Sequence, residues 1–366
     1  MSQWDEIRKD FPATARGAFL NAAAGSPVPR PVSEALLAYL REIGEDDQWG
    51  PWLRRQERAR EQVARLLGAE ADEIAFVPNT STGMNIVAEL LSGDGAVLSD
   101  ELEFPTVTLP WIHRGTTVHF VPAVEGILHL ESFAAPNAPR AATILISHVQ
   151  FSNGCRQDLD AFGALKEQRK LVVCGSQSVG AFPVDVKHSG IDALASAGYK
   201  WLCAGYGTGF VYVSRELLKR PPHSIGWLSV ERPFAHNNRE YTLLDSARRY
   251  EMGCPAFAGA IAMGAAAEYL LGIGIETIAQ RVLELNAYLT SRLEHAGLTT
   301  LSPAGPHRSA QTLVQTPDPK GTARALLERG IHVTRKPEGV RISTHLYNNE
   351  EDVDRCVKAL EELRAG

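Results

Sequence analysis

The sequence has few cysteines and no long apolar stretch. Its 366 residues include five cysteines, an odd and scattered number without a CxxC pair, which fits free thiols in a reducing compartment better than a disulfide framework. No stretch approaches about 18 consecutive apolar residues, the length that suggests a membrane-spanning helix. The N-terminus lacks the basic and then apolar pattern of a signal peptide. These absences predict a cytoplasmic protein that has no membrane partner.

Basic residues are not in excess either. The 37 Lys and Arg residues face 43 Asp and Glu residues, a net charge of −6, so no binding surface for nucleic acid is expected. The histidines show no metal-ligand spacing with a carboxylate or cysteine, so no metal site is expected. What is present is an ordinary globular composition, 44% hydrophobic and 22% charged, in a chain long enough for a large core and two domains.

The middle of the chain alternates short β-rich runs with helical patterns. Residues 158–170, for example, carry apolar Leu159, Phe162 and Leu165 at helical spacing. Continuous apolar strands between amphipathic helices are typical of a largely parallel sheet covered on both faces. We therefore predict an α/β fold that binds ligands where strand C-termini meet helix N-termini. The predicted strands are residues 74–77, 96–99, 117–121, 144–147, 171–174 and 210–213.

The pattern changes near residue 215, where proline-containing loops begin. Two long helices are then predicted, and the remaining chain alternates strand, helix, strand and helix, as in a small α+β domain. The two long helices are predicted over residues 256–271 and 275–296. The predicted division is an N-terminal segment (1–50) that packs with the small domain, a large domain (51–255), and a linking helix with the small domain (256–366).

Lys200 is the strongest candidate for chemistry. It lies between Tyr199 and Trp201, after an apolar run and before the glycine-rich turn of residues 205–209. Poor solvation disfavours the charged form of an amine and makes it a nucleophile. Such a lysine can form a Schiff base with an aldehyde, although most lysines are simply exposed to solvent.

Two further segments carry polar groups that suit anions. Asn79 to Gly83 follow a predicted strand and open a helix, whose N-terminus suits a phosphate; the simpler alternative is an ordinary N-cap. Arg341 lies in the C-terminal domain, where it could hold a carboxylate through two parallel hydrogen bonds. Its simpler alternative is a surface salt bridge.

Together these segments resemble the class V aminotransferase family, the pyridoxal-phosphate (PLP) enzymes of fold type I, in the branch of cysteine desulfurases and isopenicillin N epimerase-like proteins. The resemblance covers nearly the whole chain and is densest from Leu171 to Ser214. It implies a mainly parallel seven-stranded sheet, PLP as cofactor, a small amino-acid substrate, and a homodimer with shared active sites. The matching segments include Phe19 to Gly25, Asn79 to Asn85, Glu103 to Thr106, Gly154 to Leu159, Arg249 to Pro255 and Val340 to Ser343.

The resemblance also implies roles for single residues. Lys200 matches the Schiff-base lysine, and Arg341 matches the arginine that grips the substrate α-carboxylate. The remaining implied roles are phosphate ligands (Thr80, Ser81), a cofactor ring neighbour (Phe104), a partner for the cofactor 3′ oxygen (Gln177), a residue toward the partner subunit's phosphate (Cys254), and the loop nearest the substrate carboxylate (Asn21, Ala22).

Cys174 departs from the family pattern. Relatives place an aspartate there, which keeps the pyridine nitrogen protonated so that the ring accepts electrons. A thiol has an ordinary pKa near 8.5 that burial raises, and it is a weak donor. Losing the charged hydrogen bond would cost about 1–2 kcal/mol, which slows proton abstraction at Cα by roughly 5- to 30-fold.

Three functions remain open on this sequence. A neutral ring favours β-elimination of the C–S lyase kind, because the leaving group takes the electrons. The alternatives are class V aminotransferase or epimerase chemistry, and a protein that keeps the fold but has lost PLP chemistry and serves as a binding module. A persulfide-forming desulfurase is disfavoured, since residues 297–350 contain no cysteine, while a C–S lyase that uses no cysteine stays open. Cys254, where relatives usually have threonine, predicts weaker retention of PLP.

Overall fold

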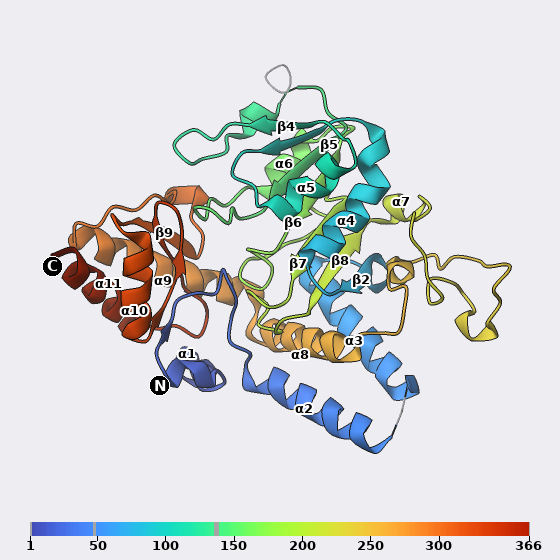
Figure 1. Cartoon of the computed structure of the whole chain (residues 1–366), viewed down its shortest axis with the longest axis horizontal. Coiled ribbons are helices and arrows are strands. Elements are labelled where there is room, and N and C mark those ends of the chain that lie inside the picture. The colour runs from blue at the N-terminus through green and yellow to red at the C-terminus, as the bar shows by residue number, and fades with distance from the viewer. Residues whose placement is uncertain (1, 47–48, 135–138, 366) are drawn as a thin grey trace.

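The computed structural model describes residues 2–46, 49–134 and 139–365. Its centre is a seven-stranded sheet in the order β2-β8-β7-β6-β5-β3-β4, which confirms the predicted α/β fold (Figure 1). In this sheet β8 runs in the direction opposite to the other six strands. The strands are β2 (Ile74–Val77), β3 (Val97–Asp100), β4 (Val118–Val121), β5 (Thr143–Ser147), β6 (Lys170–Cys174), β7 (Ala193–Ala197) and β8 (Gly209–Val213).

This topology brings six strand ends to one edge. β3 to β7 are parallel. β2 is antiparallel to β8, which is antiparallel to β7, so β2 runs in the same direction as the others. The C-terminal ends of β2 to β7 therefore lie together, beside the start of β8. In such sheets this edge is where ligands bind.

The central strands are buried along their whole length, because helices cover both faces of the sheet. Every residue of β5, β7 and β8 is buried. Alternate residues enter separate apolar clusters: Leu145 packs in one cluster, while Ile144 and Ile146 pack in the other. This two-sided burial is the reason the strands are continuous apolar runs rather than alternating ones.

Helix α4 (Thr80–Leu91) packs closely on the sheet through Gly83. A Cβ at this position would lie 2.8 Å from the Cβ of Ala195 and 3.4 Å from that of Val211, so a larger residue would push the helix away. The other helices around the sheet are α3 (Trp49–Leu67), α5 (Pro105–His113), α6 (Leu159–Leu165), α7 (Arg215–Leu218) and α8 (Phe257–Ile273). Helix α6 is shorter than predicted, because the chain turns at Glu167, whose φ is 53°.

Helix α9 (Ile275–His295) follows α8 after a break at Gly274, where φ is 94°. Among the described residues no single helix is both long and apolar enough to cross a membrane; α8 and α9 reach that length and composition only as a pair, bent by 78°.

The C-terminal elements form a separate group at one end of the molecule (Figure 1). A three-stranded antiparallel sheet has the order β11-β12-β9, and its apolar cluster includes Leu289, Val314 and Val353. The elements are β9 (Gln311–Gln315), α10 (Pro319–Glu328), β10 (Ile331–His332), β11 (Thr334–Arg335), β12 (Gly339–Ser343) and α11 (Glu350–Ala365).

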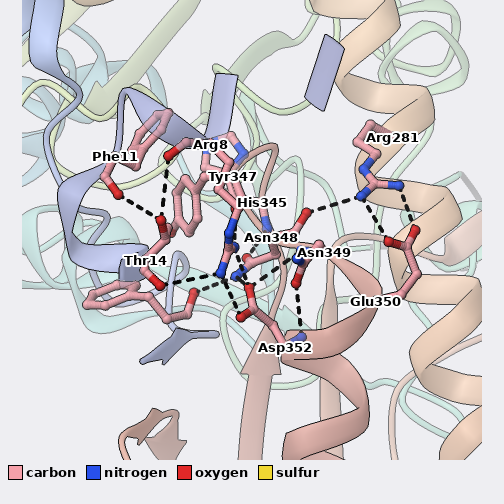
Figure 2. Close-up of polar contacts among 11 residues, drawn as sticks. Arg8, Phe11, Thr14, Arg281, His345, Tyr347, Asn348, Asn349, Glu350 and Asp352 are labelled. Carbon is pink, nitrogen blue, oxygen red and sulfur yellow. Dashed lines mark hydrogen bonds and ion pairs between the residues drawn. The ribbon is translucent and has the colours of Figure 1, made fainter. Parts of the chain in front are cut away.

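The N-terminal segment contacts both groups of elements. After α1 (Gln3–Lys9), β1 (Ala18–Phe19) pairs with β10. Arg8 donates to Asp352 at 2.7 Å and to the Tyr347 carbonyl at 2.6 Å (Figure 2). Helix α2 (Arg30–Glu45) instead packs on α8 beside the large sheet (Figure 1). The chain thus runs from the C-terminal group back to the large sheet within its first 45 residues.

Candidate active site

Lys200 lies in a tight turn directly after β7, at the edge where the strand ends meet. Two hydrogen bonds of 2.8 Å close the turn: Gly198 donates to the Thr208 carbonyl and Ala204 donates to the Gly198 carbonyl. Cys203 donates to the Lys200 carbonyl at 3.1 Å and has a φ of 56°, a left-handed conformation that is uncommon for residues with a side chain. The turn therefore fixes the backbone of Lys200.

The Lys200 amine is poorly solvated, as its neighbours predict. Burial lowers its pKa to about 8; the Cys174 thiol opposes this shift and the Arg341 charge adds to it. Nζ lies 5.7 Å from the centre of the Tyr199 ring, and that ring stacks on Tyr206 at 4.7 Å. A substantial fraction of this amine is neutral near pH 8, which a nucleophile or general base requires.

Cys174 ends β6 and pairs in register with Ala195 of β7. Its Sγ lies 3.5 Å from Ser176 Oγ, and Ser176 Oγ lies 2.6 Å from Thr80 Oγ1. Burial raises the pKa of the thiol, and the Glu103 charge raises it further. A neutral thiol and two hydroxyls therefore connect this strand end with the start of α4.

Two acids at this edge of the sheet, Glu103 and Asp100, were not predicted as site residues. Glu103 accepts hydrogen bonds from Ser147, through its backbone N–H and, at 2.6 Å, its hydroxyl, and from Gln150 at 3.1 Å. Asp100 accepts a second bond from the same Gln150 amide. Burial raises the pKa of both acids. The sequence signal was their position just after a predicted strand.

The start of α4 has the properties of both alternatives considered for it. Asn79 is an ordinary N-cap, since its Oδ1 accepts from the Thr82 N–H at 2.9 Å. The first helical N–H groups have no partner within the helix, so Thr80 and Ser81 still present donors at its positive end. Ser81 Oγ lies 2.5 Å from Thr106 Oγ1. The phosphate role of Thr80 and Ser81 stays a prediction.

Gln177 connects the site to the N-terminal loop. Its amide nitrogen donates to the Ala23 carbonyl at 3.0 Å, and its oxygen accepts from the Trp201 indole at 3.0 Å. Because these protein groups occupy the amide, the contact with the cofactor oxygen stays a prediction. Gln177 does bring the N-terminal loop beside the Lys200 turn.

Asn21 and Ala22 belong to this loop and lie beside β12. Asn21 forms an isolated parallel bridge with Ser343, and Ala22 donates to the Ser343 carbonyl at 3.5 Å. Asn21 Oδ1 accepts a hydrogen bond from Thr334 Oγ1. The loop thus lies next to the strand that carries Arg341, as its predicted role requires.

Arg341 is 3% exposed, which excludes the surface salt bridge considered above. Its Nη1 donates to the Phe151 carbonyl at 2.6 Å and its Nη2 to Thr334 Oγ1 at 3.5 Å. Its Nε has no partner in the part of the chain that the structure describes. Burial lowers its pKa to about 10. Within the described parts of the chain no carboxylate lies in ion-pair range of Arg341, so the guanidinium retains donors for an anion.

Phe104 lies at the start of α5, is 47% exposed, and contacts Phe151 edge to face at 5.0 Å. Cys254 is exposed and lines a cavity of about 240 Å³ beside the end of β2. The roles of Phe104 at a cofactor ring and of Cys254 toward a partner's phosphate stay predictions.

Lys336 was missed. Its Nζ lies 4.1 Å from the centre of the Phe151 ring. Burial lowers its pKa, and the charges of Arg341 and Lys200 lower that pKa further. The residue stands in a short hairpin without a periodic pattern, and no sequence signal identified it.

These residues fit PLP. The partly neutral Lys200 amine suits the aldehyde, and the N-terminus of α4, with the hydroxyls of Thr80 and Ser81, suits the phosphate. The thiol of Cys174 stands at the adjoining strand end, and its role beside the ring stays a prediction.

Known proteins share this architecture. Residues 18–356 match the family model "Aminotransferase class-V". The uncharacterized aminotransferase YcbU of Bacillus subtilis (strain 168) is 28% identical over 360 residues, 96% of each chain. Isopenicillin N epimerase of Amycolatopsis lactamdurans is 30% identical over 399 residues, 98% of each chain. The apo structure of a cysteine desulfurase from Thermococcus onnurineus NA1 superposes with a TM-score of 0.90 at 26% identity, over 98% of this chain and 97% of that one. The chain therefore belongs to the class V aminotransferase family and is a PLP-dependent enzyme.

Proposed function

We propose that the protein removes a substituent from Cβ of a small amino acid, in the manner of a C–S lyase. The observation that carries this proposal is the neutral Cys174 thiol at the strand end beside Lys200. PLP, when bound, supplies an electron sink for the carbon that loses its proton. The protein's own groups hold the substrate, move the proton and set how strongly that sink withdraws electrons.

Arg341 would hold the α-carboxylate. It is buried, fixed on the Phe151 carbonyl, and its Nε has no partner among the described residues. A buried cation without a counter-ion is unfavourable, and pairing with an anion removes this cost. The fork of a guanidinium suits the two oxygens of a carboxylate.

Lys200 would take the proton from Cα. With a pKa of about 8, its neutral form is available near physiological pH, the condition for an effective general base. In the proposed reaction the Cα–H bond breaks, its electron pair forms the Cα–Cβ double bond, and the Cβ–substituent bond breaks with its electrons on the leaving group. The enamine that forms hydrolyses to a keto acid and ammonia.

Cys174 biases the outcome. A neutral thiol withdraws less electron density through a ring nitrogen than a protonating acid does. Reactions that keep the electrons on the cofactor are therefore slowed most. Elimination is slowed least, because the leaving group carries the electrons away. The relatives named as an aminotransferase and an epimerase favour the second candidate, transamination or epimerisation.

Product analysis separates these outcomes. With S-alkyl cysteines, we expect keto acid and ammonia in equal amounts while PLP is not consumed. A keto acid formed with matching loss of PLP would establish transamination, and inversion at Cα without keto acid would establish epimerisation; either contradicts the elimination proposal. The matched control is alanine, which has no leaving group and should give little product.

We further propose that the enzyme works as a cytoplasmic homodimer. Cys254 and Met252 are exposed beside the cavity at the end of β2, and Tyr206, which stacks on Tyr199, is 79% exposed. A second subunit would cover them. Sedimentation equilibrium should give twice the chain mass of 39.9 kDa, and a monomer with full activity would contradict the proposal.

A further inference from the structure

Lys336 has a fixed position at the turn between β11 and β12. Its backbone N–H donates to the Gly339 carbonyl at 2.8 Å, and Gly339 donates back at 3.4 Å. The adjoining strands are in register, with Thr334 opposite Arg341 and Arg335 opposite Val340. The hairpin that carries Arg341 therefore also sets where the Lys336 side chain starts.

The side chain extends to the residue that positions Arg341. Nζ of Lys336 lies 4.1 Å from the centre of the Phe151 ring, and the carbonyl of Phe151 accepts the Arg341 hydrogen bond at 2.6 Å. The same ring contacts Phe104 at 5.0 Å. Lys336 thus contacts the side chain of Phe151, and Arg341 contacts its backbone carbonyl.

The ammonium of Lys336 forms no ion pair among the described residues. Burial and the charges of Arg341 and Lys200 lower its pKa to about 7, and Glu338 in its own turn opposes this only in part. No carboxylate of the described residues lies within ion-pair range of Lys336. Three amine or guanidinium groups therefore share the site, and one substrate α-carboxylate pairs with only one of them.

We propose that Lys336 binds an acidic group on the substrate side chain, which makes the substrate class a short amino acid with a second anionic group. This rests on the proposed function, because Arg341 must hold the α-carboxylate for Lys336 to be free. The ring of Phe151 keeps the ammonium in place through its face, and the anion supplies the charge that the pocket lacks.

The probes are L-aspartate and L-asparagine, which have nearly the same shape and differ in the charge of the side chain. Binding to the PLP-loaded protein is measured by the change in cofactor absorbance and by calorimetry, so turnover is not needed. A charge-assisted hydrogen bond predicts roughly 10- to 100-fold tighter binding of aspartate. Lys336→Met should remove that preference and leave asparagine binding within about 3-fold.

Two matched variants are the controls. Lys336→Arg keeps the charge and should retain the preference, while Lys358→Met changes an exposed lysine on α11 and should have no effect. Equal binding of both amino acids by the wild-type protein would overturn the role of Lys336 and leave the proposed function intact. Binding of neither would overturn both, since Arg341 would then hold no α-carboxylate.

The pH dependence gives a readout that a purely structural role would not change. Lys336 is charged below its pKa of about 7, so the preference for aspartate should be full below that pH and fall by up to about tenfold per pH unit above it. Arg341, Lys200 and Glu338 also act on Lys336, and all three remain in Lys336→Met. Dividing the wild-type ratio by the Lys336→Met ratio at each pH therefore isolates the part that Lys336 supplies. In Lys336→Arg the ratio should not change with pH; a wild-type ratio that is equally flat would contradict the proposal.

Discussion

The two walls of the site differ in charge. The wall formed by the ends of β2 and β6 presents neutral groups, the Cys174 thiol and the hydroxyls of Ser176 and Thr80. The wall formed by the β11–β12 hairpin presents Arg341 and Lys336 without carboxylate partners among the described residues. The contrast indicates strong recognition of an anionic substrate combined with weak electron withdrawal, and Lys200 stands between the two walls.

Replacing Lys200 should have the largest effect, because the groups of both walls influence the reaction of this one amine. In Lys200→Ala we expect a loss of activity of roughly 10²- to 10⁴-fold together with loss of the absorbance of the bound cofactor. Gel-filtered protein is measured before and after incubation with PLP. Lys219, an exposed lysine on the surface, gives the matched control Lys219→Ala. Full activity in Lys200→Ala would remove the amine from the reaction.

Replacing Arg341 tests the cationic wall alone. Arg341→Met removes two charge-assisted hydrogen bonds of roughly 1.5 kcal/mol each, so KM for an amino acid should rise about 100-fold with a smaller change in kcat. The control is the corresponding amine without the carboxylate, whose KM should not change. If both substrates weaken equally, the arginine supports the fold rather than the carboxylate.

Replacing Cys174 tests the neutral wall. Cys174→Asp should raise transamination roughly 5- to 30-fold, because a carboxylate near the ring nitrogen keeps it protonated. Burial and the nearby Glu103 charge already raise the pKa of the thiol and will oppose ionisation of the new acid, so the lower end of this range is expected. Cys174→Ser keeps a neutral donor and should behave as the wild type. No difference between the two variants would mean that this residue does not face the ring.

The smallest expected effect concerns retention of the cofactor. Cys254→Thr should tighten PLP binding by roughly 2- to 10-fold, the value of one added neutral hydrogen bond, if the residue reaches the phosphate of a neighbouring subunit. The measurement is PLP content after dialysis, at protein concentrations above and below that at which the dimer forms. Tight stoichiometric PLP in the wild-type protein would contradict the predicted weak retention.

The sequence predicted the large sheet well, because buried strands are continuous apolar runs whose ends must meet at one edge. Lys200 and Thr80 follow two such runs and Cys174 ends a third, and the structure brings them together. The apolar run before Lys200, residues 191–195, was not predicted as a strand, and its last three residues begin β7. Two-residue strands such as β10 and β11 have no periodicity, so their pairing was not predictable.

Side-chain pairing was the larger gap. Nothing in the local sequence shows that Lys336 would reach Phe151, or that Gln177 would bond to Ala23 and Trp201. These contacts join segments far apart in the chain, and only the closed fold creates them. Arg341 was predictable as a candidate, but its burial and its open Nε depend on elements distant in sequence.

The bond from the Ala23 N–H to Ser343 Oγ spans 320 positions of sequence at 3.0 Å. During synthesis on the ribosome, the segment around residue 23 emerges early and must wait until β12 has been translated before this part of the pocket can close. Contacts of such long separation form slowly. A nascent chain stalled before β12 should therefore contain a folded central sheet and still be unable to hold an amino acid.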